Sequence, residues 1–411
     1  MRISVLCRNN YIGNVSPLST TLKICLIALF MIGGSFAGFS QEKKKELSPL
    51  EKKAQVIGEL PSVNKGDKEI KQLVAPKGYR LELKGTDRPQ VIDLQGRIIT
   101  PLVDAQVQLY YQLIDESNGE RADVPNRIVN VPGEYTPNNS VNPRPEVIPT
   151  LREWLGLKGY YSLKQKGKII VAPENYAVLK ESMKQFSSDM AYFGKRNYGV
   201  KSGKSKPGVI YVTLNCSDKA LGKEGYRLTI NDRILLEANT PQGVFMGTRT
   251  ILQLANLYDQ KIPKGITRDY PKYARRGFML DVARKFFRIE FLRDYVRILS
   301  YYKMNEFHVH LNDNGFKQFA GNDWMKTYAA FRLECDTYPG LTAKDGSYSK
   351  EEFTELQRLG MSYGVNVIPE IDAPAHSLAF TQYRPSLGSE KYGMQNSVLD
   401  ITRLFRLSVL F

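Results

Sequence analysis

One stretch of the chain, residues 275–311, constrains the fold more than any other. It begins with a short apolar run that ends in a carboxylate, Asp281, and it closes with a run in which apolar side chains alternate with two histidines. Between them, residues 289–302 place their apolar side chains at the spacing of one helix face. A strand, a helix and a strand of these lengths predict a β-α-β unit, whose two strands pair in parallel.

The same pattern continues with a further helix and a further strand. Ser349 and Glu352 have the spacing of a capping box at the start of a helix over residues 349–363, and Gly364 is the residue type that ends helices. Residues 364–372 then fit a third strand. Successive strands joined by helices are typical of a (β/α) barrel, in which the functional groups lie at the C-terminal ends of the strands.

Polar side chains gather at those predicted strand ends. All three histidines of the chain, His308, His310 and His376, fall in this region. The charged residues that follow the strands are Asp281, Arg284, Asp313, Glu370 and Asp372. A single histidine is more often a core residue with satisfied hydrogen bonds. Three histidines together with several acids at successive strand ends favour a functional site instead.

Three motifs in this region, RRGFMLDVARKFF, HVHLND and PEIDAPAH, resemble the first three strand-end motifs of glycoside hydrolase family 20, the β-N-acetylhexosaminidases. The resemblance covers residues 271–399. It implies a TIM barrel, (β/α)8, that removes terminal β-linked N-acetylglucosamine or N-acetylgalactosamine from glycans, without a cofactor or metal. It also implies a retaining reaction in which the N-acetyl oxygen of the substrate is the nucleophile.

The resemblance assigns roles residue by residue. Arg284 matches the arginine that grips the outer hydroxyls of the terminal sugar. The residues expected to bind substrate are Arg284, Asp281, His310 and Glu370. The residues expected to set the electrostatics of the catalytic acid are Asp313, Asp372 and His376. This chain has Asn314 and Phe316 where the family often reads H-L-T-D-D-Q-G-W, and it lacks one residue there. The resemblance therefore leaves the fine substrate preference open.

The catalytic pair of the family, an adjacent Asp-Glu after the fourth strand, does not occur after Gly277. Residues 275–411 suffice for about three strands of a barrel that needs about 250 residues. The last segment, residues 401–411, is apolar and does not look like the continuation of the family. We therefore expect a truncated catalytic barrel. Either the reading frame is interrupted near Thr402, or the protein is naturally short.

The N-terminal region predicts export. Residues 22–39 form an apolar run with basic residues before it, and small residues suit cleavage before Gln41. This favours a secretory signal peptide over residues 1–40 rather than a membrane anchor, and a periplasmic, cell-surface or secreted protein. Cys7 and Cys25 lie in this leader. Cys216 and Cys335 lie far apart in sequence, which predicts neither a disulfide framework nor a zinc site.

The rest of the chain divides by composition. Residues 41–74 are charged and without a clear period, which predicts a linker with a short helix at most. Residues 75–132 contain alternating runs such as Val107–Leu113 and 91–94, typical of an immunoglobulin-like β-sandwich. Residues 133–149 fit a second linker. Residues 150–270 predict an α+β domain that resembles the non-catalytic support domain before the family 20 barrel, and residues 271–411 are the barrel segment.

The net charge of +16 is spread thinly and lacks the aromatic-basic repeat of nucleic-acid binders. The expected partner is a glycan with a terminal N-acetylhexosamine, with no nucleic acid and no stable membrane anchor. Two hypotheses remain. The first is an exported exo-β-N-acetylhexosaminidase, and the second is a non-catalytic glycan-binding or adhesion protein with a degenerate barrel. The sequence leaves the oligomeric state open.

Overall fold

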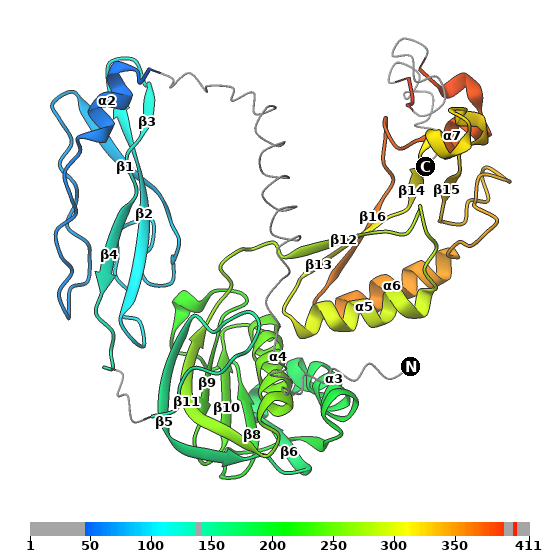
Figure 1. Ribbon diagram of the computed structural model, residues 1–411. Helices are drawn as coiled ribbons and strands as arrows, with labels where there is room; N and C mark the ends of the chain where they lie inside the picture. Colours follow the sequence, from blue (N-terminus) through cyan, green and yellow to red (C-terminus); the bar gives the residue numbers. More distant parts are fainter. Residues whose placement is uncertain (1–45, 137–140, 390–397, 401–411) are drawn as a thin grey trace, which may run out of the picture.

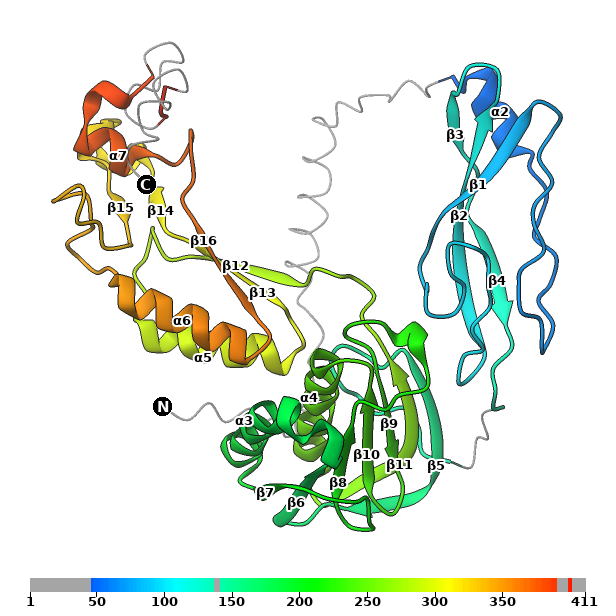
Figure 2. The same ribbon diagram turned by 180° about the vertical axis from the view of Figure 1, so that it is seen from behind.

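The computed structural model describes residues 46–136, 141–389 and 398–400. In chain order it has an N-terminal β module, a central α+β domain and a β/α unit (Figures 1 and 2). The predicted signal peptide and the segment 401–411 lie outside the described residues. No helix within the described ranges has the length and apolar character that a membrane span requires.

The N-terminal module is one antiparallel sheet in which the long strand β2 pairs with all the others. Its elements are α2 (Pro49–Gln55), β1 (Tyr79–Thr86), β2 (Ala105–Asp115), β3 (Arg121–Asp123) and β4 (Arg127–Val131). Along β2 the buried and less buried side chains alternate, so one face of the sheet forms the core. The predicted strand at residues 91–94 is wrong, because it contributes only an isolated bridge between Ile92 and Ile98.

The short helix allowed for within residues 41–74 is present as α2, but the described part of this segment is not a linker. Leu50 and Ala54 of α2, together with Ile57 and Ile70, are buried in the core of the β module. Four apolar side chains scattered over 21 positions have no period that a sequence pattern detects, yet they cover the sheet. The described residues hold a single four-stranded sheet here, and the immunoglobulin-like assignment stays a prediction.

The central domain is a seven-stranded mixed sheet with two long helices packed against it (Figure 1). Its strand order is β5-β11-β9-β10-β8-β6-β7. The elements are β5 (Glu153–Ser162), β6 (Lys166–Val171), η2 (Pro173–Asn175), α3 (Tyr176–Gly194), β7 (Asn197–Ser202), β8 (Ile210–Thr213), η3 (Lys219–Leu221), β9 (Tyr226–Ile230), β10 (Ile234–Ala238), α4 (Pro241–Tyr258) and β11 (Lys261–Asp269). The α+β composition agrees with the sequence-based expectation, although β5, β7 and β11 were not predicted.

The β/α unit has the predicted parallel sheet, in the order β12-β13-β16. Its elements are β12 (Gly277–Asp281), α5 (Ile289–Tyr301), β13 (Glu306–His310), β14 (Asn312–Asn314), η4 (Lys317–Ala320), η5 (Trp324–Lys326), β15 (Ala329–Phe331), α6 (Lys350–Ser362), β16 (Asn366–Glu370), α7 (Leu378–Tyr383) and η6 (Pro385–Leu387). Helices α5 and α6 lie side by side against this sheet (Figures 1 and 2). The described residues of this unit form this open sheet and a separate two-stranded sheet of β14 and β15, not a closed barrel.

Local capping signals are confirmed at α6. The N–H of Glu352 donates to Ser349 Oγ at 3.0 Å, and Glu352 Oε2 accepts the N–H of Ser349 at 2.9 Å. After the helix, Gly364 has a φ of 66°, a left-handed conformation that glycine adopts without a steric penalty. The chain can therefore reverse directly into β16.

The β/α unit is docked on the central domain through one buried and one half-buried ion pair. Lys303, just after α5, lies 2.9 Å from Asp269, and Arg276, just before β12, lies 2.5 Å from Glu224. Phe245 of α4 also joins the apolar core between the sheet and its helices. These contacts fix the N-terminal ends of the parallel strands and leave their C-terminal ends facing away from the central domain.

Candidate functional site

The three parallel strands end in one row of polar side chains. Asp281 lies beside His310 in the parallel register, and His310 lies beside Glu370. His310 Nδ1 and Glu370 Oε2 are 2.5 Å apart, so a short hydrogen bond joins two of the strands. The predicted gathering of polar groups at the C-terminal edge of the sheet is confirmed.

Asp313, in the short strand β14, lies at the centre of the site. Its Oδ2 is 2.8 Å from His310 Nε2 and 2.9 Å from Arg284 Nη2. Its Oδ1 is 2.7 Å from His376 Nδ1 and accepts the N–H of Asn314 at 2.7 Å. The residue is only 1% exposed. A buried carboxylate is tolerated when it is paired and hydrogen-bonded, and here a guanidinium and two imidazoles surround it.

Arg284 follows the end of β12 and is held by oxygen acceptors. Its Nη1 donates to Asp281 at 2.8 Å, and its Nε donates to the Asn314 carbonyl at 3.1 Å. Asp281 Oδ1 also accepts the backbone N–H of Arg284 at 3.0 Å, which fixes the turn after the strand. The side chain is still 37% exposed. Because a guanidinium carries five N–H donors, part of its capacity remains open to a ligand from solvent.

The loop after β16 carries Asp372 and His376, and Asn312 holds it at both ends. The Asn312 side-chain amide donates to the carbonyls of Asp372 and His376 at 3.0 Å each and accepts the N–H of Asp372 at 2.8 Å. His376 has a φ of 54°. This left-handed conformation costs a residue with a β-carbon on the order of 1 kcal/mol and is frequent at functional sites. The loop therefore places His376 against Asp313 in a strained backbone conformation.

His310 has a shifted pKa. Burial alone would lower the pKa of its imidazole, because the charged form loses hydration. The hydrogen bonds and charges of Glu370 and Asp313 outweigh burial and raise the pKa above its usual value of 6.5. His308 Nε2 lies 3.1 Å from the same Glu370 oxygen. The site therefore favours a charged imidazolium held between two carboxylates.

This shift predicts a pH dependence of stability. The folded state binds the His310 proton more tightly than the unfolded state does. The resulting stabilisation is therefore complete below about pH 6.5, the unfolded-state pKa, and is lost as the pH rises through the folded-state pKa. We expect the free energy of unfolding, measured by urea denaturation, to fall as the pH is raised above 6.5 in this way. The fall should be smaller in His310→Gln; identical slopes in both proteins would contradict the assignment.

Six of the seven predicted site residues join one hydrogen-bonded network: Asp281, Arg284, His310, Asp313, Glu370 and His376. Asp372 is the exception. Its carboxylate lies near the two imidazoles, with one ligand atom from each of the three groups within 4.8 Å of the others, but within the described ranges its contacts run through its backbone. The structure thus brings the predicted residues together, while their individual roles stay predictions.

The donor set suits a hydroxylated ligand better than a metal ion. Two sets of groups have ligand atoms within 4.8 Å of one another: His310, Asp372 and His376, and Asp281, His310 and Asp313. Both ring nitrogens of His310 already engage carboxylates, and the Arg284 guanidinium lies against Asp313. A cation would have to displace these bonds beside a fixed positive charge. Sugar hydroxyls, by contrast, can accept from the guanidinium and donate to the carboxylates.

Two residues that organise the site were not predicted, Asn312 and Arg332. Arg332 is fully buried after β15 and donates to the carbonyls of Val282 and Ala283 at 3.0 and 2.8 Å. It thereby holds the chain just before Arg284. Asn312 belongs to the HVHLND motif, so its position in the sequence could have indicated a role in the site. Nothing in the local sequence FRLE distinguishes a buried arginine from an exposed one, because its partners come from distant loops.

Two family models match the chain. The one described as "Glycosyl hydrolase family 20, catalytic domain" matches residues 273–403, and "Glycosyl hydrolase family 20, domain 2" matches residues 144–270. Together the two matches cover more than half of the chain. They meet in the short segment before β12, where the central domain passes into the β/α unit.

Curated relatives match over the same region. The chain is 34% identical over 165 residues to a β-hexosaminidase of Akkermansia muciniphila, covering 39% of this chain and 33% of the relative. It is 31% identical over 180 residues to a β-N-acetylhexosaminidase of Cellulomonas fimi, covering 43% and 35%. The chain thus spans about a third of the length of these relatives.

Solved structures support the fold. The family 20 β-N-acetylhexosaminidase of Streptomyces coelicolor A3(2) matches with a TM-score of 0.53 at 24% identity, over 66% of this chain and 57% of that one. An exo-β-N-acetylglucosaminidase of Vibrio harveyi in complex with N-acetylglucosamine gives 0.51 at 19% identity, over 71% and 48%. The likeness implies the same fold, with a TIM-barrel catalytic domain to which β12, β13 and β16 belong.

Proposed function

Because the chain belongs to glycoside hydrolase family 20, we propose that its strand-end network is the sugar-binding part of an exo-β-N-acetylhexosaminidase site. The proposed substrate is a glycan that ends in β-linked N-acetylglucosamine or N-acetylgalactosamine. The observation that carries the proposal is the exposed Arg284 guanidinium, fixed between two carboxylates at the C-terminal edge of the sheet. A planar fork held in this way can donate to two neighbouring hydroxyls of one sugar ring.

The proposed reaction is substrate-assisted hydrolysis with retention of configuration. The N-acetyl oxygen of the sugar attacks its own anomeric carbon, and a general acid protonates the departing oxygen. Since no Asp-Glu pair follows Gly277 in the 411 residues, we assign to this chain the groups that bind and orient the sugar. Asp313, with His310 and His376, supplies the charged, buried support for that binding edge.

The proposal predicts that Arg284→Lys weakens binding of N-acetylglucosamine to the full 411-residue chain. A lysine ammonium cannot reproduce the bidentate geometry, and losing one charged contact costs on the order of 2 kcal/mol, or about thirtyfold in affinity. Ligand-observed NMR titration measures the change. Arg293→Lys is the control, because Arg293 pairs with Glu355 on the outer helices at 3.0 Å. Affinities of wild type and Arg284→Lys within about threefold would refute the assignment.

Export belongs to the same proposal. It is supported by the apolar run at residues 22–39 and its basic flank. We expect the mature protein to begin near Gln41. N-terminal sequencing of material from the extracytoplasmic fraction measures this directly, and an intact Met1 in a membrane fraction would refute it.

A further inference from the structure

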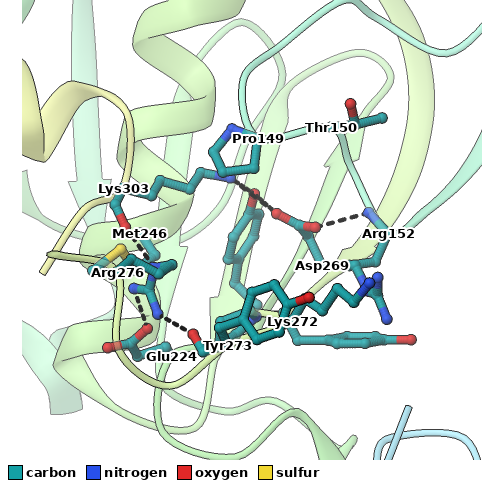
Figure 3. A pocket seen from close by; sticks show the side chains of 13 residues that line it. Pro149, Thr150, Arg152, Glu224, Met246, Asp269, Lys272, Tyr273, Arg276 and Lys303 are labelled. Carbon is teal, nitrogen blue, oxygen red and sulfur yellow. Dashed lines mark hydrogen bonds and ion pairs between the residues drawn. The ribbon is translucent and has the colours of Figure 1, made fainter. Parts of the chain in front are cut away.

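A cavity of about 300 Å³ lies at the junction of the central domain and the β/α unit (Figure 3). Two of its lining residues, Arg276 and Lys303, lie shortly before β12 and β13. The Arg284 network lies beyond the opposite, C-terminal ends of the same strands. The cavity is therefore separate from the proposed sugar site, and its volume suits a small molecule.

The charged groups on the floor of the cavity neutralise one another. Lys303 Nζ donates to Asp269 at 2.9 Å and to the Tyr226 hydroxyl at 2.8 Å, and this hydroxyl donates to the same Asp269 oxygen at 2.6 Å. Arg276 and Glu224 form the second ion pair, also seen in Figure 3. These groups are satisfied by one another, so they leave no net charge for a ligand to meet.

Two further cationic side chains line the cavity without an acidic partner among the described residues, those of Arg152 and Lys272. The backbone N–H of Arg152 donates to Asp269 at 2.9 Å, as drawn in Figure 3, but its guanidinium does not take part in that bond. The Arg152 Nε atom is buried and has no hydrogen-bond partner within the described ranges. Its Nη2 donates only to a backbone carbonyl, that of Asp87, at 3.2 Å. A buried donor without an acceptor is costly. An anionic group that enters the cavity would satisfy this donor and meet two positive charges.

The remaining wall is apolar and aromatic. Met246 and Tyr270 are 3% and 4% exposed, and prolines complete the surface around them. The Arg152 guanidinium lies 5.3 Å from the centre of the Tyr270 ring, and Lys272 Nζ lies 5.3 Å from the centre of the Tyr273 ring. The cationic groups therefore lie beside aromatic faces, where an aromatic ring of a ligand can also pack.

We propose that this cavity binds a small aromatic monocarboxylate. Its carboxylate accepts hydrogen bonds from Arg152 and a charge contact from Lys272, because a guanidinium fork matches a planar carboxylate. Its ring packs between the thioether of Met246 and the tyrosine rings. A ligand with only a carboxylate, or with only an aromatic ring, would make one of these two kinds of contact and not the other.

The test uses the full 411-residue chain and three probes in ligand-observed NMR titrations: benzoate, acetate and benzyl alcohol. Benzoate should bind saturably, at least about tenfold more tightly than either half-probe, since each lacks the charge contact or the ring contact. Its affinity should fall as NaCl is raised. No saturable benzoate binding, or equal binding of benzyl alcohol, would overturn the proposal.

Variants locate the site. Lys272→Met should weaken benzoate binding about fivefold or more, while Lys168→Met, which removes the same charge from an exposed position on β6, should leave it unchanged. Met246→Trp should abolish binding by filling the cavity. Far-UV circular dichroism verifies the fold of each variant, and a benzoate-dependent rise of the wild-type Tm is an independent readout. Equal weakening by Lys272→Met and Lys168→Met would place benzoate elsewhere and overturn the proposal.

Discussion

Asp313→Ala is expected to lose about 3 kcal/mol of stability and to bind N-acetylglucosamine at least tenfold more weakly. The carboxylate is 1% exposed and pairs with His310 and Arg284, so its removal leaves the Arg284 guanidinium without this counter-charge and His310 Nε2 without its partner. Removing one partner of a buried ion pair costs about 3–5 kcal/mol. Because Arg284 is 37% exposed and can turn toward water, we expect the lower end of that range.

Urea denaturation and sugar titration at one pH measure the two effects. Asp294→Ala is the matched control, because Asp294 is exposed on α5 and pairs with Arg297 at 2.8 Å, a surface pair worth less than about 1 kcal/mol. Asp313→Asn keeps the shape and one acceptor oxygen, so its stability should lie between alanine and wild type. Unchanged sugar affinity in a folded Asp313→Ala protein would show that the network does not support the binding edge.

The sequence predicted those parts of the fold that depend on neighbouring residues. The capping box at Ser349 and the glycine stop at Gly364 act within one turn, and both are in place. The alternation of apolar residues with His308 and His310 predicted a strand. The polar residues at the ends of the predicted strands indicated that the functional groups gather at the C-terminal edge of the sheet. The parallel direction of the strands then follows, because a helix that connects two neighbouring strands of one sheet returns the chain to the edge at which the first strand began.

The parts that were not predicted depend on contacts between distant segments. Leu50 and Ala54 pack into a core whose strands begin about 30 residues later, and no helical or strand periodicity in the surrounding sequence predicts this packing. In the same way, the central sheet places β5 beside β11, although the two strands lie about a hundred residues apart. Such pairings are chosen by the whole core rather than by either strand, so pattern analysis of one segment cannot find them.

The candidate site shows the same division. The motif residues were found because they follow strands, whereas their support comes from β14 and the loop after β15. Arg332 is the clearest case, since all five of its N–H donors find acceptors. These acceptors are the carbonyls of Val282, Ala283 and Gly346, the Asp345 carboxylate and the Tyr328 hydroxyl. One side chain thus ties the turn before Arg284 to the loop at residues 345–346.

Arg332→Met is therefore expected to be the most damaging single change in the unit. It leaves the carbonyls of Val282 and Ala283 without donors and leaves Asp345 without its cation, which should cost more than about 3 kcal/mol in urea denaturation. Arg332→Lys should restore only part of this loss, because an ammonium with three donors cannot span five acceptors. Arg358→Met, on the exposed side of α6, should change stability by less than about 0.5 kcal/mol.

Sugar affinity separates a positioning role from a purely structural one. If Arg332 orients the turn that carries Arg284, a folded Arg332→Met protein at low temperature should bind N-acetylglucosamine at least about tenfold more weakly, since a small displacement breaks a bidentate contact. Arg358→Met should bind like wild type. Should folded Arg332→Met retain wild-type affinity within about twofold, the arginine stabilises the loop without positioning the Arg284 guanidinium, and Asp281 and Asp313 suffice to hold Arg284.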